Sequence, residues 1–282
     1  MNEMIKKPLL AERWFSGRAF VGLNAALHGT PDEVLEKEGA FMSALVLALL
    51  DRQRDGTLPD PGLWGFYATC QRHLAKSQSQ ILQDLWVIHM LRSKRGGYFV
   101  EFGGCDGLYL SNTALLERDY GWTGILAEPD PVWHGDLADN RACAVDHRCV
   151  APLGGQSARF RRVAGTPELS RMAGIVPDDV HERSGNRAEY DEIDVTTVTL
   201  NGLLSDHNAP YEIDYLSIDT EGSEYEILRS FDFSAHRIAL ITVEHAGEAA
   251  KRDKIRHLLE AQGYRHWRPE LTRWDDWYVL KD

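Results

Sequence analysis

The segment from Tyr98 to Asn112, YFVEFGGCDGLYLSN, constrains the fold more than any other part of the chain. Its apolar and aromatic start, 98–102, is typical of a buried strand. Gly103, Gly104 and Gly107 follow, and they allow backbone angles and close approaches that a Cβ would obstruct. Helical periodicity then resumes. The segment therefore predicts a strand, a turn and a helix, with a candidate ligand cradle in the turn.

The order of the glycines bears on which ligand the turn suits. A dinucleotide-binding turn needs G-x-G-x-x-G to bring a helix N-terminus against a pyrophosphate, whereas residues 101–107 read EFGGCDG. This acidic-x-Gly-x-x-x-Gly order resembles the first motif of class I S-adenosylmethionine (SAM) methyltransferases, whose ligand has a sulfonium cation and no phosphate. A carboxylate at Glu101 suits that cation. A strand-to-helix turn without a ligand is the alternative interpretation of these seven residues alone.

Composition limits the class of protein. The chain has 282 residues, of which 43% are hydrophobic and 26% charged, so it can bury a core for one large domain with an extension. Its formal charge of -12 argues against a mainly electrostatic attachment to nucleic acid, which needs a basic footprint. We therefore expect no nucleic-acid partner.

The sequence predicts no membrane segment. Residues 1–14 lack a continuous apolar region, and the most apolar window, 41–50, is too short to span a bilayer. The four cysteines have neither C-x-x-C spacing nor the density of a disulfide scaffold. We expect reduced thiols in a cytoplasmic protein, and we leave open whether the chain forms a homo-oligomer.

Two regions follow from the pattern along the chain: a helical extension at 1–95 and an α/β domain at 96–282. Within the extension, helices are predicted from Thr30 to about Asp55, at 64–76 and at 81–92, with a proline- and glycine-bearing break at 58–62. From Tyr98 onward, apolar strands alternate with helical stretches. That alternation predicts a mostly parallel sheet covered on both faces.

The elements of the α/β domain can be placed in order. The predicted strands are 98–102, 124–128, 144–150, 213–218 and 238–244, and 264–268 with 276–280 would close a seven-stranded sheet as an antiparallel pair. The predicted helices are 111–118, 131–140, 223–230 and 248–262. Ser223 and Glu226 fit a capping box at the start of the third of these helices.

A long irregular stretch, 156–204, lies between the third and fourth predicted strands. Only 158–163 and 194–199 within it have strand-like spacing. Long loops inside a compact domain are often functional, so we expect an inserted, lid-like segment, whose part 164–190 would cover a bound acceptor. A solvated charged loop is the alternative.

Ligands of open α/β sheets bind outside the carboxyl ends of the strands. The second predicted strand ends at Glu128, where a carboxylate can accept hydrogen bonds from both hydroxyls of a ribose. The same arrangement serves the ribose of NAD, so Glu128 indicates an adenosyl ligand without naming it. A helix N-cap network built on Asp130 is the alternative.

Acidic residues also follow the fourth and fifth predicted strands. Asp219 and Glu221 come after the apolar run 213–218, and buried carboxylates are costly unless they are paired. Glu244 and His245 end the fifth strand. If the two strands are neighbours, these side chains can face one cleft. The cluster can act as a general base or orient a substrate, and Asp219, Glu244 and His245 can alternatively hold a divalent cation such as Mg²⁺.

Together, these motifs resemble the FkbM-type methyltransferase family, a branch of the class I SAM-dependent methyltransferases. The resemblance covers about residues 79–280 and rests on SQxxQD at 79–84, VEFGGCDGLYLSNT at 100–113, WTGILAEPDP at 122–131, NR at 140–141, IDYLSIDTEGSEYEIL at 213–228 and VEH at 243–245. Two positions depart from the family pattern. Ala246 stands where Asn is frequent, which concerns the acceptor contacts, and Cys105 stands where a small residue such as Ala is usual.

The resemblance implies a seven-stranded class I methyltransferase (Rossmann-like) sheet, SAM as methyl donor and O-methyl transfer to a sugar or other small-molecule hydroxyl. The residues that would surround SAM are Glu101, Gly103, Asp106, Ser111, Asn112 and Glu128. Those that would line the reaction site are Asp219, Glu221, Glu244 and His245. Two alternatives remain at this point: an NAD(P)-dependent oxidoreductase on a similar sheet, against which the glycine order weighs, and a non-catalytic interaction protein that keeps the fold.

Overall fold

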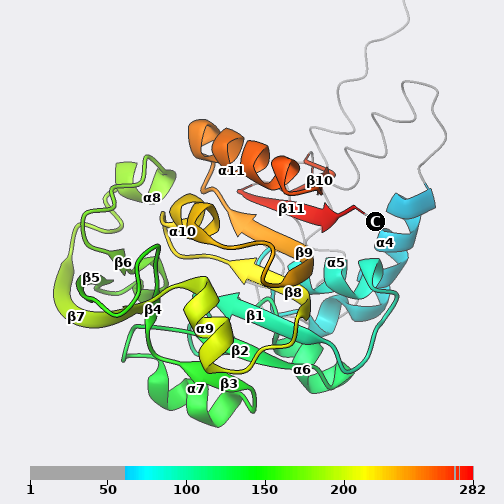
Figure 1. Cartoon of the computed structure of the whole chain (residues 1–282), viewed down its shortest axis with the longest axis horizontal. Coiled ribbons are helices and arrows are strands. Elements are labelled where there is room, and N and C mark those ends of the chain that lie inside the picture. Colours follow the sequence, from blue (N-terminus) through cyan, green and yellow to red (C-terminus); the bar gives the residue numbers. More distant parts are fainter. Residues whose placement is uncertain (1–60, 270, 273, 282) are drawn as a thin grey trace, which may run out of the picture.

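The structure is a computed structural model that describes residues 61–269, 271, 272 and 274–281. The helix predicted from Thr30 lies outside them. Seven strands form the main sheet in the order β10-β11-β9-β8-β1-β2-β3 (Figure 1). Their bounds are β1 Tyr98–Phe102, β2 Thr123–Ala127, β3 Ala144–Asp146, β8 Glu212–Ile218, β9 Arg237–Glu244, β10 Tyr264–Trp267 and β11 Asp275–Leu280.

The predicted seven-stranded sheet and its antiparallel closing pair are confirmed. Strand β1 is flanked by β8 and β2, both parallel to it, so that Val100 lies opposite Leu216 on one side and Ile125 on the other. Strands β8 and β9 are parallel neighbours, with Ile218 opposite Val243. Strand β11 runs antiparallel to both β9 and β10. The carboxyl ends of β1, β2, β8 and β9 therefore meet at one edge of the sheet.

The strand predicted at 144–150 is divided. Its first part, β3, pairs with β2, but β4, Cys149–Val150, joins a second sheet. The Asp146 carboxylate accepts a hydrogen bond from the backbone N–H of Arg148 at 2.9 Å and also binds the guanidinium of Arg148. Such a local side-chain bond competes with strand pairing and turns the chain.

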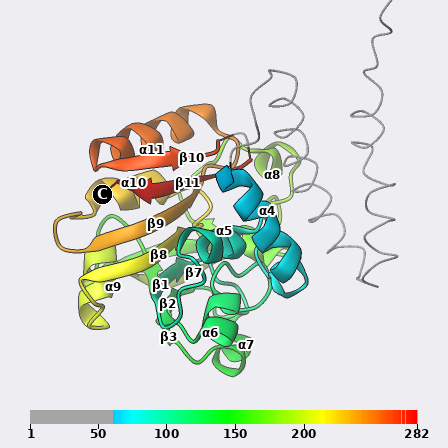
Figure 2. The same ribbon diagram turned by 90° about the vertical axis from the view of Figure 1, so that its right-hand side faces the viewer.

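Helices cover both faces of the main sheet (Figure 2). One face carries α4 Pro61–His73, the 3₁₀ turn η1 Leu74–Lys76, α5 Gln83–Met90 and α6 Ala114–Tyr120. The other face carries α9 Leu200–Asp206, α10 Glu224–Ser230 and α11 Ala249–Ala261. Helix α7 is His134–Asn140. Phe99 packs on the first face and Val100 on the second, as the two-residue period of a strand requires.

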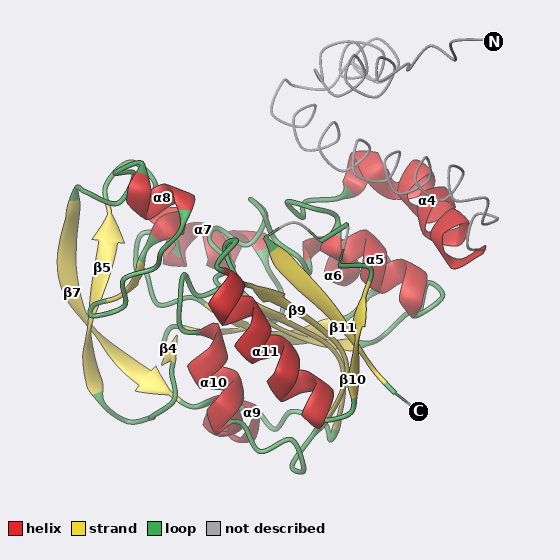
Figure 3. Cartoon of the chain, turned by 90° about the horizontal axis from the view of Figure 1, so that it is seen from above, coloured by secondary structure: helices red, strands yellow, loops and turns green. Residues whose placement is uncertain are grey.

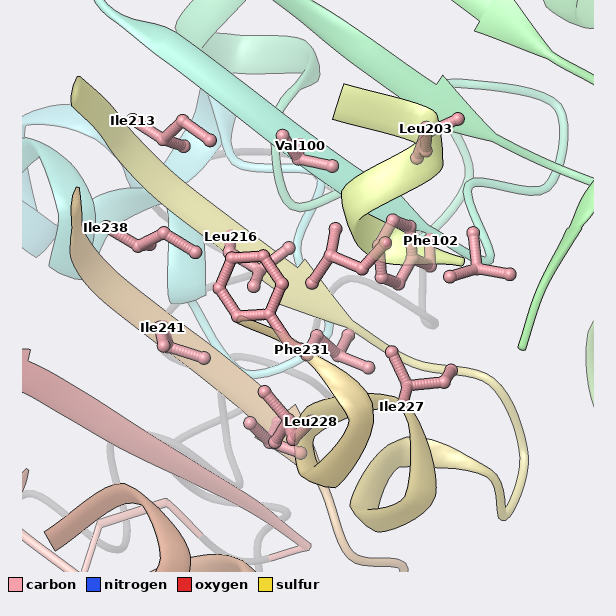
Figure 4. Packing of buried hydrophobic residues seen from close by; sticks show 14 of the residues in the cluster. Val100, Phe102, Leu203, Ile213, Leu216, Ile227, Leu228, Phe231, Ile238 and Ile241 are labelled. Carbon is pink, nitrogen blue, oxygen red and sulfur yellow. The ribbon is translucent and has the colours of Figure 1, made fainter. Parts of the chain in front are cut away.

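Each face has its own hydrophobic core. On the α10 side, Val100, Leu216 and Ile241 of the sheet meet Ile227 and Leu228 of α10 (Figure 4). The opposite core is aromatic: the ring centroids of Trp86 and Trp277 are 5.2 Å apart, and Trp267 stacks on Trp277 at 5.6 Å. Since α4 and α5 contribute Leu63, Phe66 and Leu85 to this core, they are packed directly onto the sheet.

The stretch predicted to be irregular, 156–204, contains three strands of a small sheet, which β4 joins from outside the stretch (Figure 3). Its strand order is β4-β7-β5-β6, with β5 Ser157–Val163, β6 Arg171–Met172 and β7 Tyr190–Val198; η2 Pro167–Leu169 and α8 Val180–Arg183 lie between the strands. Strands β5 and β7 pair antiparallel from Ser157–Thr196 to Val163–Tyr190. Their outer faces are charged, with Arg162 bound to Asp191, so hydrophobic alternation is weak.

Helix α9 also begins inside this stretch. The Thr199 side chain caps it by accepting a hydrogen bond from the Gly202 N–H at 3.0 Å. Cys70, Cys105, Cys143 and Cys149 are free thiols, as predicted. Among the described residues, no helix combines the length and the apolar character that crossing a membrane requires.

Candidate active site

A cavity of about 720 Å³ opens where β1, β2, β8 and β9 end, which is the edge that the sequence indicated. Its size is in the range of small-molecule sites. The loops after these four strands line one side, and residues of β5, η2, β6 and α8 line the other. Segment 156–204 therefore forms a wall of the cavity.

Glu101 holds the loop after β1 in shape. It is 2% exposed, and its carboxylate accepts hydrogen bonds from Ser111 Oγ at 3.0 Å, Asn112 N at 2.6 Å and Thr113 Oγ1. Arg141 supplies the counter-charge at 3.5 Å. Glu101 lines the cavity, but its oxygens are occupied by donors of the protein, and the Ser111 hydroxyl is used in the same network.

Asp106 has a similar internal role. Its Oδ1 accepts hydrogen bonds from the N–H groups of Leu108 at 2.8 Å and Tyr109 at 2.6 Å, and Asp106 is not among the residues that line the cavity. Gly103 does line it, with φ of +72°. A Cβ at Gly103 would clash with the carbonyl oxygen of Asp219. The absence of a side chain thus lets the loops after β1 and β8 touch.

Asn112 has a hydrogen-bonding atom to spare. It is 7% exposed, and its Nδ2 donates to Ser217 Oγ at 2.9 Å. Its Oδ1 has no partner among the described residues. Buried polar atoms are normally paired. Because Asn112 lines the cavity, a ligand with an N–H or O–H donor would satisfy it.

Glu128 lies at the end of β2 and lines the same cavity. Its two oxygens accept hydrogen bonds from Cys105 N at 3.2 Å and Asp130 N at 2.8 Å. Burial raises the pKa of the Glu128 carboxyl to about 8. Asp130 is not the N-cap that the alternative interpretation required, because α7 starts only at His134 and its N-cap is Trp133.

Three acids meet at the ends of β8 and β9. Asp219, Glu221 and Glu244 each place one carboxylate oxygen within 4.8 Å of the other two, and all three line the cavity. Burial, followed by the neighbouring acids, raises the pKa values of Asp219 and Glu244 well above the usual range. Burial raises the pKa of Glu221 to about 7, against the opposing effect of Arg187. Asp219 and Glu244 therefore form a pair suited to sharing a proton.

The structure does not bring His245 into this cluster. Its Nδ1 accepts a hydrogen bond from Gly247 N at 3.1 Å, and its Nε2 lies 3.7 Å from Asp276 on β11. His245 directly follows Glu244, and successive side chains of an extended chain point to opposite sides. Glu244 therefore lines the cavity whereas His245 does not. The carboxylate that joins Asp219 and Glu244 is that of Glu221.

The helix after β8 starts differently from the prediction. Ser223 is the N-cap residue of α10, but its hydroxyl donates to Thr220 Oγ1 at 2.8 Å and makes no capping bond, so the capping box with Glu226 is wrong. The Glu224 side chain binds the turn before α10 instead. Its Oε1 accepts a hydrogen bond from Gly222 N at 2.8 Å, and Lys251 pairs with its Oε2 at 3.1 Å. Since buried Glu224 can reach these groups, it stabilises the turn in place of a cap.

Residues outside the predicted site also shape the cavity. Gln80 and Gln83, before β1, and Trp274, before β11, line it. Gln83 donates to Asp275 at 2.7 Å, and Trp274 donates to Gln80 at 3.0 Å. The SQxxQD motif was a signal for the two glutamines. No pattern pointed to their pairing with the C-terminal strand.

The backbone is strained at four of the lining positions that are not glycine. Cys105, Leu110, Glu221 and Ala246 have φ values of +48°, +59°, +58° and +53°, in the left-handed region that favours glycine. Residues held there carry an energetic cost and are concentrated at functional sites. The four residues lie in the loops after β1, β8 and β9, so the strain is shared by three of the loops that line the cavity.

The strand order, the single antiparallel strand β11 among parallel neighbours and the acids at the ends of β2, β8 and β9 define a class I SAM-dependent methyltransferase. The sequence model of the methyltransferase FkbM domain matches residues 101–266, more than half of the chain. The chain belongs to this family.

Several solved structures of methyltransferases are similar to this chain, with low sequence identity. A methyltransferase FkbM from Methylobacillus flagellatus is 16% identical with a TM-score of 0.43; the similarity covers 88% of this chain but only 60% of that one. An O-methyltransferase from Bacillus cereus, in complex with SAH, is 13% identical with a TM-score of 0.37, and the similarity covers 96% of this chain and 100% of that one. A human methyltransferase 10 domain containing protein is 14% identical with a TM-score of 0.38, and the similarity covers 87% of this chain and 97% of that one. Among curated proteins, none matches.

Proposed function

We propose that the protein is a SAM-dependent O-methyltransferase that acts on a hydroxyl of a sugar or another small metabolite. One observation carries the proposal: a single cavity has the buried Glu128 at the end of β2 and the Asp219–Glu244 pair at the ends of β8 and β9. The first suits an adenosyl donor, and the second suits removal of a proton. We also propose a cytoplasmic location, which the free thiols support.

The residues around Glu128 fit SAM. The Glu128 carboxyl is buried without a cationic partner among the described residues, and the two hydroxyls of a ribose would supply the donors that stabilise its ionised form. The unpaired Oδ1 of Asn112 would accept from the ammonium group of the methionyl part. When bound, SAM supplies an electrophilic methyl group next to a sulfonium cation.

The Asp219–Glu244 pair would handle the acceptor proton. A neutral alcohol is a poor nucleophile, so transfer needs a base within hydrogen-bonding reach of the hydroxyl. Two buried carboxyls this close together do not easily ionise at the same time, so the pair would hold one proton and keep one ionised group to take a second. Glu221, paired with Arg187, would be the third carboxyl beside them.

A divalent cation such as Mg²⁺ is the alternative use of the same acids. Asp219, Glu221 and Glu244 would be the protein ligands, since carboxylate oxygens suit Mg²⁺ and Ca²⁺. His245, which the sequence had offered as a ligand, does not reach them. If the cation is required, thorough chelation abolishes methyl transfer and Mg²⁺ restores it; unchanged activity after chelation leaves the proton-sharing pair as the base.

Calorimetric titration of the protein with SAM and, separately, with NAD tests the donor. We expect SAM to bind and NAD not to bind; tight NAD binding without SAM binding would overturn the proposal. Transfer of labelled methyl groups from SAM to a panel of sugars and simple alcohols tests the acceptor. SAM binding with no transfer to any acceptor would favour the non-catalytic interaction protein.

A further inference from the structure

Arg187 connects three separate parts of the cavity wall. It lies just before β7, and its side chain is 1% exposed. Its NH1 donates to both carboxylate oxygens of Asp179, at 2.7 and 2.8 Å, and its NH2 pairs with Glu221. Its Nε donates to the carbonyl oxygen of Leu169 at 3.3 Å. All three nitrogens of this guanidinium therefore contact an acceptor of the protein.

Each partner of Arg187 controls a different part of the cavity. Glu221 belongs to the acid cluster after β8. Asp179 is the N-cap of α8 and accepts a hydrogen bond from Glu182 N at 2.7 Å, and residues of α8 line the cavity. Leu169 ends η2, all of which lines the cavity as well. Arg187 therefore joins the acids of the sheet to both helical turns of segment 156–204.

A second contact brings the same two parts together. Gly222, next to Glu221, has φ of +125°, and a Cβ there would lie 2.5 Å from Cγ2 of Ile175 in segment 156–204. The segment thus lies directly on the loop after β8. Arg187 is the charged part of this contact, and its planar set of donors serves three acceptors in a way that the single ammonium of a lysine cannot.

We propose that Arg187 is a positioning residue for the acceptor half of the cavity: it sets the direction of the Glu221 carboxylate and fixes the wall formed by η2 and α8 against it. The proposal rests on the proposed function. Glu128 and Asn112, which would bind SAM, have no hydrogen bond or ion pair with Arg187 in the described part of the chain, so we expect the donor half to be independent of it.

Because Arg187 acts through Glu221, the effects of changing the two residues should not add. Removing one partner of a buried ion pair leaves the other uncompensated, and residues of one network couple strongly. The test compares Arg187→Met, Arg187→Lys, Glu221→Gln and the double variant Arg187→Met/Glu221→Gln, all saturated with SAH. Arg187→Lys and Glu221→Gln are mild changes that keep the test decisive if Arg187→Met fails to fold.

Amide hydrogen exchange measures how stably the wall formed by η2 and α8 is held, and it needs no acceptor. We expect Arg187→Met and Glu221→Gln to raise the amide exchange rates at 166–170 and 179–186 by about tenfold. The exchange rates of the double variant should not exceed those of Arg187→Met. Arg187→Lys should exchange more slowly than Arg187→Met. Calorimetry with SAH should give dissociation constants within about twofold of the unchanged protein. Unchanged exchange in Arg187→Met, or additive effects in the double variant, would overturn the proposal.

Methyl transfer from labelled SAM to a panel of neutral methyl glycosides gives the catalytic readout. Arg187→Met should raise KM for the acceptor more than tenfold while KM for SAM stays constant, and Arg187→Lys should restore part of the loss. If no glycoside is methylated even by the unchanged protein, the sugar part of the proposed acceptor class is contradicted. The exchange measurement still decides the role of Arg187.

Arg171 provides a matched control. It is equally buried in the same segment, with its Nε donating to Ile175 O at 3.0 Å and its NH2 to Glu182 at 3.1 Å. It has no hydrogen bond or ion pair with Glu221 in the described part of the chain. Both arginines contact Glu182, so Arg171→Met can couple indirectly to Glu221→Gln, but this coupling should be much smaller than that of Arg187→Met. Coupling as large as that of Arg187 would mean that any buried arginine in the segment has the same effect, and the specific role would be lost.

Discussion

Glu128 is the residue whose charge state should respond most directly to the donor. Its pKa is about 8 in the free protein because the carboxyl is buried. Hydroxyl donors from a ribose would favour the ionised form and lower this pKa in the complex. The complex then binds fewer protons than the free protein below pH 8, so the affinity for the ligand rises with pH up to about 8 and is level above it.

Calorimetry with SAH between pH 6 and 9 measures this dependence. We expect the dissociation constant to fall by up to about tenfold per pH unit below pH 8, with proton release in that range. Glu128→Gln should weaken binding and flatten the profile, and Glu128→Ala should weaken SAM binding as well. A Glu128→Ala variant with the affinity of the unchanged protein would contradict the ribose assignment.

Asp219 should matter for turnover and not for SAM binding. Asp219→Asn keeps the size of the side chain but removes the carboxyl that we propose to share a proton with Glu244. General base catalysis contributes about 10²–10⁴-fold, so kcat should fall by that order while the SAM dissociation constant changes little. Steady-state kinetics and SAH calorimetry on the same preparations check both values. His245→Gln, outside the cavity, should retain far more activity; equal losses in both variants would argue against the base assignment.

At the scale of elements, the close approach of two loops depends on one glycine. Gly103 has φ of +72°, and a Cβ there would meet the Asp219 carbonyl oxygen. Gly103→Ala should therefore push the loops after β1 and β8 apart, lower the thermal midpoint and reduce SAM affinity together. Gly121, with φ of +67° and no atom near an added Cβ, is the control: Gly121→Ala should show the backbone cost alone, about 1–2 kcal/mol. Equal effects of both would mean that the contact is unimportant.

The elements were predicted best where one physical signal dominated. Tyr98–Phe102 is apolar apart from Glu101, and its strand has the predicted bounds. In segment 156–204, the strand-like spacing at 158–163 indicated β5 and that at 194–199 indicated only the end of β7. The pairing of the two strands was not predicted, because it involves pairs such as Arg162 with Asp191. Cross-strand ion pairs depend on the register of two strands, which a single sequence does not reveal.

At the scale of the molecule, α4 and α5 should unfold together with the sheet. Trp86 of α5 is fully buried against Trp277 of β11, near the other end of the chain. Trp86→Ala should lower the free energy of unfolding by about 3–5 kcal/mol in a single cooperative transition, measured by urea denaturation with fluorescence and circular dichroism. Tyr211→Ala, at a 59% exposed position, should stay within about 0.5 kcal/mol. Separate transitions would show that the helices are an independent unit.

The sequence by itself determined the sheet, the order of its strands along the chain and the acids at the ends of β2, β8 and β9, because apolar runs and turn residues are local signals. The tertiary structure alone decided which of those acids meet. Glu221 joins Asp219 and Glu244 while His245 turns to Asp276, and Arg187 reaches the cluster from a segment more than thirty residues away in sequence. Contacts of this kind depend on the direction of side chains and on the packing of distant segments, which spacing along a chain does not encode.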